Sequence, residues 1–374
     1  MTEKIASIIE FIERNLCDTS RSYEWDNNGV QIKTYKDTVS KVGLALDPTM
    51  QVIDTAIDKG CGLLITHHPL FFSKFKKIST DELLGKKVIK AIKSDLNIYS
   101  YHTNFDLADY SLNDYIAEKL NLEVVSFLEK FGSERYYKYV VFVPKGYENL
   151  IYQKCAELKV GILGNYSSVS FTTEGVGRFK PEEGANPFIG DVGEVEEVQE
   201  YRIEVLVEES KLKSLIKGII EVHPYEEVAY DLYPLKLERE FGLGRICELK
   251  DKMNINEFKR YICQMLDIDG FRMNGDFDFI VEKVAILTGS GATYWKNCKA
   301  SGVNLLITGD MKHHDAIDAY ENGVAIFDLG HYQTERIFMY YLKNVLSSRF
   351  NVEFLLIDEQ LPIINYTIKE NKNV

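Results

Sequence analysis

The sequence predicts an α/β protein in which two related α/β halves form one body and flank an inserted ferredoxin-like α+β domain. Three observations carry this prediction. Short apolar runs alternate with helical patterns at both ends of the chain. The tetrapeptide Leu-Leu-Ile-Thr occurs twice, at Leu63–Thr66 and at Leu305–Thr308, and the pattern between the copies changes to a βαββαβ order. We therefore expect a first half over 1–128, an insertion over 129–238 and a second half over 239–374.

Composition and charge restrict the class of protein. The 374 residues are 45% hydrophobic and 27% charged, which is ordinary for a soluble globular chain, and no apolar run approaches the ~18 residues of a membrane span. The formal charge of −13 disfavours nucleic acid or an anionic membrane as a partner. Six dispersed cysteines without a CxxC pair argue against a thiolate zinc site and fit a reducing compartment. Because the first residues lack a signal-peptide pattern, we expect a cytoplasmic protein.

The first half is expected to be a βαβ arrangement behind an N-terminal helix. Residues 1–15 have isoleucines at helical spacing, which predicts an amphipathic helix. A strand from Val42, a helix over 50–59 and the strand Leu63–Thr66 then form a right-handed βαβ unit. A further helix over about 81–94 and a strand over 97–101 follow.

The second half repeats the first at matched spacing. Leu63 follows Val42 by 21 positions, and Leu305 follows Val284 by the same 21. A glycine ends the intervening helix in each copy. This agreement predicts an internal duplication, in which the pair His67-His68 of one copy is replaced by Gly309-Asp310 in the other.

Within the insertion, the sequence pattern predicts a βαββαβ order. Its expected strands and helices are, in order, a strand at 137–143, a helix at 147–158, a strand at 166–173, a long Gly- and Pro-rich hairpin or loop at 174–193, a strand at 198–207, a helix at 210–220 and a strand at 227–233.

Candidate ligands for metal ions follow predicted strands in both halves. His67 and His68 lie just past a buried strand, where open α/β sheets bind their ligands, and Asp106 lies past the next strand. His331 and Glu335 stand four positions apart at the start of a helix, so their side chains share one face. Three imidazoles and two carboxylates suffice for two divalent ions per chain. Ligands of this type favour Zn, with Fe, Mn, Co or Ni as alternatives.

Other polar residues near these strand ends have two interpretations. His102, His313 and His314 are candidates for proton transfer or substrate contact, or are solvated loop histidines. Asp47 and Asp310 could orient imidazoles, but capping of the following helices is the favoured interpretation. The glycine-rich exit at 288–292 is a weak candidate for anion binding. His223, in the insertion, is interpreted as part of a structural turn.

Six stretches together resemble one family, the dinuclear-metal toroidal hexamers named after NGG-one-interacting factor three and also called type 2 homologues of GTP cyclohydrolase 1. The resemblance implies that His67, His68, Asp106, His331 and Glu335 hold the metal pair, that the insertion is a PII-like domain, and that six chains form a trimer of dimers. The matching stretches are Trp25 to Gln31, Leu63 to Phe72, His102 to Asp106, Thr288 to Ala292, Thr308 to Ala316 and Asp328 to Glu335.

Two functions stay open, and a third is disfavoured. The first is a metal-dependent hydrolase, in which hydroxide attacks the imidazole ring carbon of GTP or of a related purine or pterin nucleotide. The second is a non-enzymatic metal-handling or regulatory hexamer whose insertion senses a small ligand. A nucleic-acid-binding toroid is disfavoured by the charge of −13.

Overall fold

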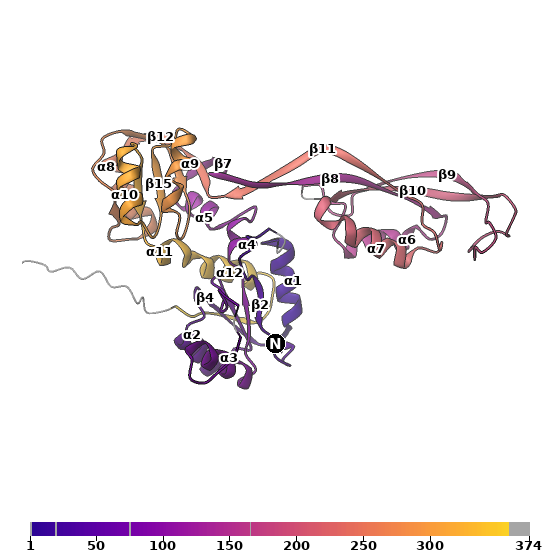
Figure 1. Ribbon diagram of the computed structural model, residues 1–374, viewed down its shortest axis with the longest axis horizontal. Coiled ribbons are helices and arrows are strands. Elements are labelled where there is room, and N and C mark those ends of the chain that lie inside the picture. Colours follow the sequence, from indigo (N-terminus) through magenta and orange to yellow (C-terminus); the bar gives the residue numbers. More distant parts are fainter. Residues whose placement is uncertain (1, 19–20, 75, 165, 359–374) are drawn as a thin grey trace, which may run out of the picture. The chain divides into compact units, whose positions relative to one another are not determined.

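The computed structural model describes residues 2–18, 21–74, 76–164 and 166–358 (Figure 1). The chain divides into two compact units. Unit 1 comprises Met1–Phe131 with Phe241–Val374, and unit 2 comprises Gly132–Glu240. Within the described residues, no helix is long and apolar enough to cross a membrane.

The first sheet of unit 1 has five strands around a parallel centre. Strands β4, β5 and β6 run parallel, β17 pairs in parallel with β4, and β2 pairs antiparallel with β6. Every residue of β5 is buried, which is typical of a strand covered on both faces. In spatial order the strands are β17 (Glu353–Leu356), β4 (Lys41–Ala45), β5 (Leu63–Thr66), β6 (Asn97–Ser100) and β2 (Gly29–Ile32).

Helices pack against this sheet through apolar stripes. The isoleucines of α1 lie in the same hydrophobic cluster as the strand residues and the buried face of α12. The N-terminal helix begins at Ile5 rather than at residue 1, because Glu3–Lys4 forms the short strand β1 with β3 (Thr38–Val39). The helices of this half are α1 (Ile5–Asn15), α2 (Met50–Asp58), α3 (Leu83–Lys93), α4 (Thr103–Asp106) and α12 (Ile337–Ser347).

The second sheet of unit 1 has six strands. Strands β14, β15 and β16 run parallel, while β12 and β13 pair antiparallel with β14 and β16. In spatial order the strands are β13 (Arg272–Met273), β16 (Ala325–Asp328), β15 (Leu305–Thr308), β14 (Ile280–Ile286), β12 (Arg245–Asn254) and β7 (Leu122–Ser126). The helices are α5 (Leu112–Lys119), α8 (Ile255–Leu266), α9 (Trp295–Ala300), α10 (His313–Glu321) and α11 (His331–Glu335).

The two sheets have the same strand order at their centres. The parallel trio β4-β5-β6 corresponds to β14-β15-β16, and each trio has an antiparallel neighbour beside its third strand. The two Leu-Leu-Ile-Thr copies are the middle strands of these trios. The outer neighbours differ, because β17 is parallel to β4 whereas β12 is antiparallel to β14.

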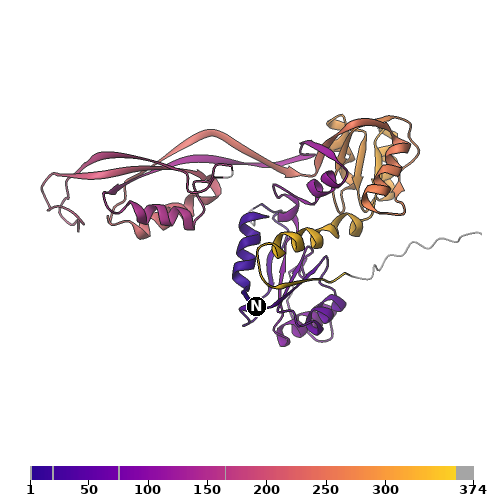
Figure 2. The same cartoon turned by 180° about the vertical axis from the view of Figure 1, so that it is seen from behind.

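Unit 2 is a four-stranded antiparallel sheet with two helices on one face (Figure 2). Its sheet order β11-β8-β10-β9 is the ferredoxin-like arrangement. Of the two alternatives for 174–193, the long hairpin is the one observed, because β9 continues to Phe179 and pairs antiparallel with β10. The elements are β8 (Glu129–Pro144), α6 (Glu148–Glu157), β9 (Ser170–Phe179), β10 (Glu196–Glu208), α7 (Leu212–Val222) and β11 (Tyr230–Leu243).

Candidate metal centre

Side chains from three strand exits of unit 1 meet at one place. His67 and His68 directly follow β5, Asp106 is the last residue of α4 beyond β6, and His331 and Glu335 are the two ends of α11 beyond β16. Each exit is the carboxyl end of a parallel strand, where side chains from neighbouring strands converge. The first sheet therefore contributes three of these residues, and the second contributes two.

Glu335 lies at the middle of the group. Its Oε2 is 3.0 Å from His68 Nε2 and 2.9 Å from His331 Nε2, whereas its Oε1 is 3.8 Å from His67 Nε2. Asp106 Oδ1 lies 3.9 Å from the same His67 nitrogen. One carboxylate oxygen thus faces His67 and Asp106, and the other faces the second imidazole pair. The Glu335 carboxylate thus lies between two sets of potential metal ligands.

The other ring nitrogen of each imidazole is already occupied. In every case Nδ1 lies within hydrogen-bond distance of an oxygen acceptor, so Nδ1–H donates and Nε2 is directed into the cluster. An imidazole held in this way is a typical metal ligand. The pairs are His67 with the Tyr101 carbonyl at 2.8 Å, His68 with Asp47 at 2.7 Å, His102 with Asp26 at 2.8 Å, and His331 with Asp310 at 2.7 Å.

Three atoms of the cluster are buried without a hydrogen-bond partner among the described residues. They are His67 Nε2, Asp106 Oδ1 and Glu335 Oε2. A buried polar atom without a partner is costly, by about 1–3 kcal/mol. Distances of 3.8–3.9 Å around His67 Nε2 are too long for hydrogen bonds, but they leave room for an ion bonded at ~2.0–2.2 Å to each ligand atom. The residues present therefore fit divalent metal ions.

The electrostatics of the cluster also favour a cation. Burial alone would lower the pKa of His68, but the hydrogen bond to Asp47 and the nearby Glu335 carboxylate raise it to about 10. Burial would likewise lower the pKa of His331, but the Glu335 carboxylate and the hydrogen bond to Asp310 raise it to about 9. Burial raises the pKa of Asp106, and the opposing effect of the nearby His67 is smaller.

Gly289 makes the approach of Glu335 possible. Its φ is +70°, and an added Cβ would lie 2.0 Å from Glu335 Oε1. Two amides of the glycine-rich exit that contains it are already hydrogen-bonded within the protein, which counts against the weak sequence interpretation of this segment as an anion site. The amide of Gly289 donates to Thr334 Oγ1 at 3.0 Å, and the amide of Thr288 donates to Asn113 Oδ1 at 2.9 Å.

The favoured interpretation of Asp47 and Asp310 as helix caps is wrong. Thr49 is the N-cap of α2 and accepts a hydrogen bond from the amide of Val52, while α10 begins after Lys312 without a side-chain cap. Asp47 and Asp310 instead hold His68 and His331. Each carboxylate follows one parallel strand and reaches an imidazole that follows the adjacent strand, a contact that sequence spacing alone does not reveal.

A comparison with known protein families shows which family this chain belongs to. The family model Duf34/NIF3 (NGG1p interacting factor 3) matches residues 3–362. The chain belongs to this family.

Relatives within the NIF3 family match over most of their length. The chain is 42% identical over 310 residues, 83% of each chain, to a Bacillus subtilis protein named GTP cyclohydrolase 1 type 2 homolog. It is 33% identical over 365 residues to a Staphylococcus aureus protein of the same name, covering 97% of this chain and 98% of that one. A crystal structure of a Bacillus cereus protein related to NIF3 superposes with a TM-score of 0.80 at 36% identity, covering 97% of this chain and 99% of that chain.

The other histidines that the sequence analysis discussed lie in three different environments of this NIF3 chain. His102 joins the cluster, since its ligand nitrogen lies within 4.8 Å of those of His67 and His68. His313 and His314 open α10 at exposed positions and belong to neither group of close ligand atoms among the described residues. His223 accepts from the Tyr225 amide at 3.1 Å and donates to the Phe142 carbonyl at 3.0 Å, as a structural turn requires.

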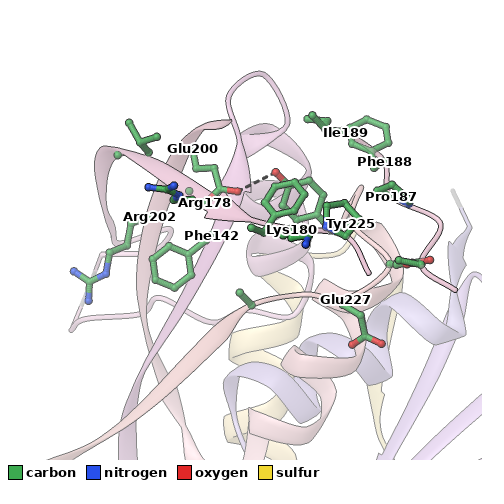
Figure 3. Close-up of a pocket in the computed structure, with 18 of the residues that line it drawn as sticks. Phe142, Arg178, Lys180, Pro187, Phe188, Ile189, Glu200, Arg202, Tyr225 and Glu227 are labelled. Atoms are coloured by element: carbon green, nitrogen blue, oxygen red, sulfur yellow. Dashed lines mark hydrogen bonds between the residues drawn. The ribbon is translucent and has the colours of Figure 1, made fainter. Parts of the chain in front are cut away.

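Unit 2 of the NIF3 chain contains a separate cavity of about 630 Å³ (Figure 3). It lies over β9 and β10 and has aromatic walls, including Phe142, Phe188 and Tyr225. Tyr225 donates a hydrogen bond to Glu200 at 2.9 Å within this cavity. None of the described residues that line it is a histidine or a cysteine, so its chemistry differs from that of the metal-ligand cluster.

Proposed function

We propose that this chain is a metal-dependent hydrolase whose two divalent ions are held by His67, His68, Asp106, His331 and Glu335. The observation that carries the proposal is the position of the Glu335 carboxylate, with His67 on one side and with His68 and His331 on the other, and with the Nε2 atoms of these anchored imidazoles directed toward it. Two ions at such a site supply an activated hydroxide and polarise the group under attack. The nitrogen and oxygen donors suit Zn first, and Fe, Mn, Co or Ni as alternatives.

The protein groups have distinct roles in this proposal. Asp47 and Asp310 keep His68 and His331 in the ligating tautomer, because each accepts the Nδ1 proton. His102 is the group for proton transfer, since Asp26 accepts at Nδ1 and Nε2 is left for exchange with substrate or water. His313 and His314 stay candidates for substrate contact at the exposed start of α10.

A purine or pterin nucleotide such as GTP is the proposed substrate class. In a purine, hydroxide would add to the imidazole ring carbon, one ring C–N bond would break to leave a formamide, and a second water would release that carbon as formate. Support comes from the name of the relatives, GTP cyclohydrolase 1 type 2 homolog. The test has two parts on one purified sample. Plasma mass spectrometry counts metal per chain, and formate release from GTP is then followed in the metal-free and the reconstituted protein. About two ions per chain with metal-dependent formate release supports the proposal, whereas two ions without release excludes GTP.

A second candidate function is a metal-handling or regulatory protein whose insertion senses a small ligand. The cavity of about 630 Å³ in unit 2 favours it, because ligand pockets have volumes of about 300–1,000 Å³ and mostly apolar walls. Gly175 lines the cavity and offers a test, since an added Cβ would meet nothing within 4 Å and a valine would add apolar atoms at the cavity wall. Indole binding by ligand-detected NMR should be lost in Gly175→Val and kept in Ser170→Val on the same strand. Indole binding that leaves metal affinity unchanged would argue against a regulatory role.

Assembly and descent complete the proposal. We propose that six chains form a trimer of dimers, that the insertion at 129–238 is PII-like, and that the halves at 1–128 and 239–374 arose by duplication. The shared order of the two parallel trios supports the duplication. Analytical ultracentrifugation tests the assembly, where a species of six chain masses is expected.

A further inference from the structure

Two exposed aromatic rings flank His102 at the edge of the metal-ligand cluster. The rings of Trp25 and Phe72 each lie 6.0 Å from the His102 ring in edge-on geometry. Trp25 is 62% exposed and Phe72 is 61% exposed, although large aromatic side chains are usually buried. The His102 ring lies 5.3 Å from that of His67 and 5.4 Å from that of His68. The exposed rings are therefore adjacent to the groups that we assign to chemistry.

Trp25 is exposed although hydrogen bonds hold the neighbouring residues of its loop in place. Asp26 accepts hydrogen bonds from His102 Nδ1 at 2.8 Å and from the Thr103 amide at 3.0 Å, and its side chain is fully buried. Asn28 Oδ1 accepts from the His102 amide at 2.8 Å. Tyr23 stacks on the indole at 5.5 Å with an interplanar angle of 27°. The indole is thus packed against Tyr23 while most of its surface stays exposed.

A fixed, exposed indole suits one kind of ligand better than others. Stacking of a nucleobase on an aromatic side chain contributes about 1–3 kcal/mol and requires only a flat π-face. A phosphate gains no comparable contact from the indole or from Phe72. The neighbouring His102 presents Nε2, which can hydrogen-bond to a polar ring edge.

We propose that Trp25 and Phe72 bind the planar heteroaromatic ring of the substrate by stacking, and that His102, held by Asp26, meets the polar edge of that ring. The inference rests on the proposed function, because it assigns the reacting part of the substrate to this edge of the metal-ligand cluster. It adds the residues that select a purine or pterin ring, and it identifies the Trp25-Asp26-Asn27-Asn28 stretch as the segment that holds them in place.

Binding is measured without turnover, so that failure of this inference is distinguishable from failure of the hydrolase proposal. Full-length, metal-loaded protein is titrated with guanosine, with pterin and with ribose by equilibrium dialysis, and metal content is measured in each sample. The variants are Trp25→Ala, Trp25→Phe and Phe72→Ala. Tyr35→Ala is the matched control, because Tyr35 is likewise an exposed aromatic side chain, at 100% exposure.

Guanosine or pterin should bind saturably, and ribose should not. Trp25→Ala and Phe72→Ala should weaken ring binding by about 5- to 150-fold, which corresponds to the stacking energy above at 1.4 kcal/mol per tenfold. Trp25→Phe should keep most of the affinity, and Tyr35→Ala all of it, with metal content equal throughout. Equal affinity in Trp25→Ala and wild type, or no saturable binding of either ring to the metal-loaded protein, overturns the inference. Ring binding without formate release would leave it standing and count against GTP hydrolysis alone.

Discussion

Asp310 and His331 meet through a 2.7 Å contact between Oδ2 and Nδ1, although 21 positions separate them in the sequence. Asp47 and His68 repeat the relationship in the first sheet at the same distance and the same separation. In both pairs the carboxylate follows one parallel strand and the imidazole follows the neighbouring strand. The two sheets thus present their imidazoles to the cluster by the same local device.

Removing that carboxylate should weaken metal binding without removing a ligand. Asp310→Ala leaves His331 free to rotate and to change tautomer, so we expect metal affinity to fall about 10- to 100-fold. Competition with a chromophoric chelator measures the change. Asp318→Ala, at an exposed position of the adjacent α10, is the control for loss of one negative charge. Equal affinity in the two variants would contradict the assigned role of Asp310.

Metal stoichiometry should distinguish the central carboxylate from an outer imidazole. Glu335→Ala removes the group between both cation positions, so we expect close to zero ions per chain. His331→Ala affects only the position shared with His68, so we expect about one ion. Plasma mass spectrometry counts the ions, and circular dichroism checks that the fold is kept. Gln333→Ala, on the same helix, should keep both ions, and unchanged metal content in Glu335→Ala would exclude the assignment.

A methyl group at Gly289 should displace Glu335. Gly289 and Gly302 both have φ of +70°, so alanine costs each about 1–2 kcal/mol of folding free energy in the left-handed region. Only Gly289→Ala places its Cβ against Glu335, because nothing lies within 4 Å of a Cβ at Gly302. Metal should therefore be lost only from Gly289→Ala, which should also unfold at a lower temperature than Gly302→Ala because it has this clash and lacks the stabilising ions. Metal retained by Gly289→Ala would show that Glu335 does not need its present position.

Acid should destabilise unit 2 partly through His223. Burial lowers the pKa of His223 below its usual 6.5, and its hydrogen bond to the Phe142 carbonyl only partly opposes this effect. Because the unfolded chain binds the proton more readily, this contribution to stability is present above pH 6.5 and is lost as pH falls toward the lower folded pKa. His223→Gln should reduce the loss of stability between about pH 7 and pH 5, measured by hydrogen exchange of β8 amides. An unchanged slope in His223→Gln, relative to the exposed control His314→Gln, would refute the prediction.

Sequence patterns predicted the short buried strands that occur in both halves of the chain. Leu63–Thr66 and Leu305–Thr308 are strands at the predicted bounds, because a short, fully buried parallel strand is a continuous apolar run. The strand β9 was harder to predict. Its glycines at 175 and 177 lower strand propensity, and its pairing with β10 gives the missing stability through contacts that are distant in sequence.

The candidate site was predictable where its residues follow strands. His67, His68, His331 and Glu335 could be grouped because strand ends of parallel sheets converge. The role of their acceptors was harder to predict. Helix capping was the favoured interpretation of Asp47 and Asp310, because the adjacency of their strand exits is set by sheet order, and Asp26 lies in the loop before β2. For the same reason the exposure of Trp25 beside His102 was not predictable, since it depends on how one loop is tied to another.

The division of the ligands between two sheets has a consequence for folding. The residues assigned to the metals come from the two sequence segments of unit 1, and the sequence of unit 2 lies between these segments. Bound ions would therefore act as a cross-link that closes a long chain segment, and their binding energy would add to the stability of the native state alone. Such a cross-link can form only after both sheets have acquired their strand order. Metal occupancy would then report on correct assembly of the whole body, and withdrawal of the ions would first loosen the joint between the sheets rather than the core of either one.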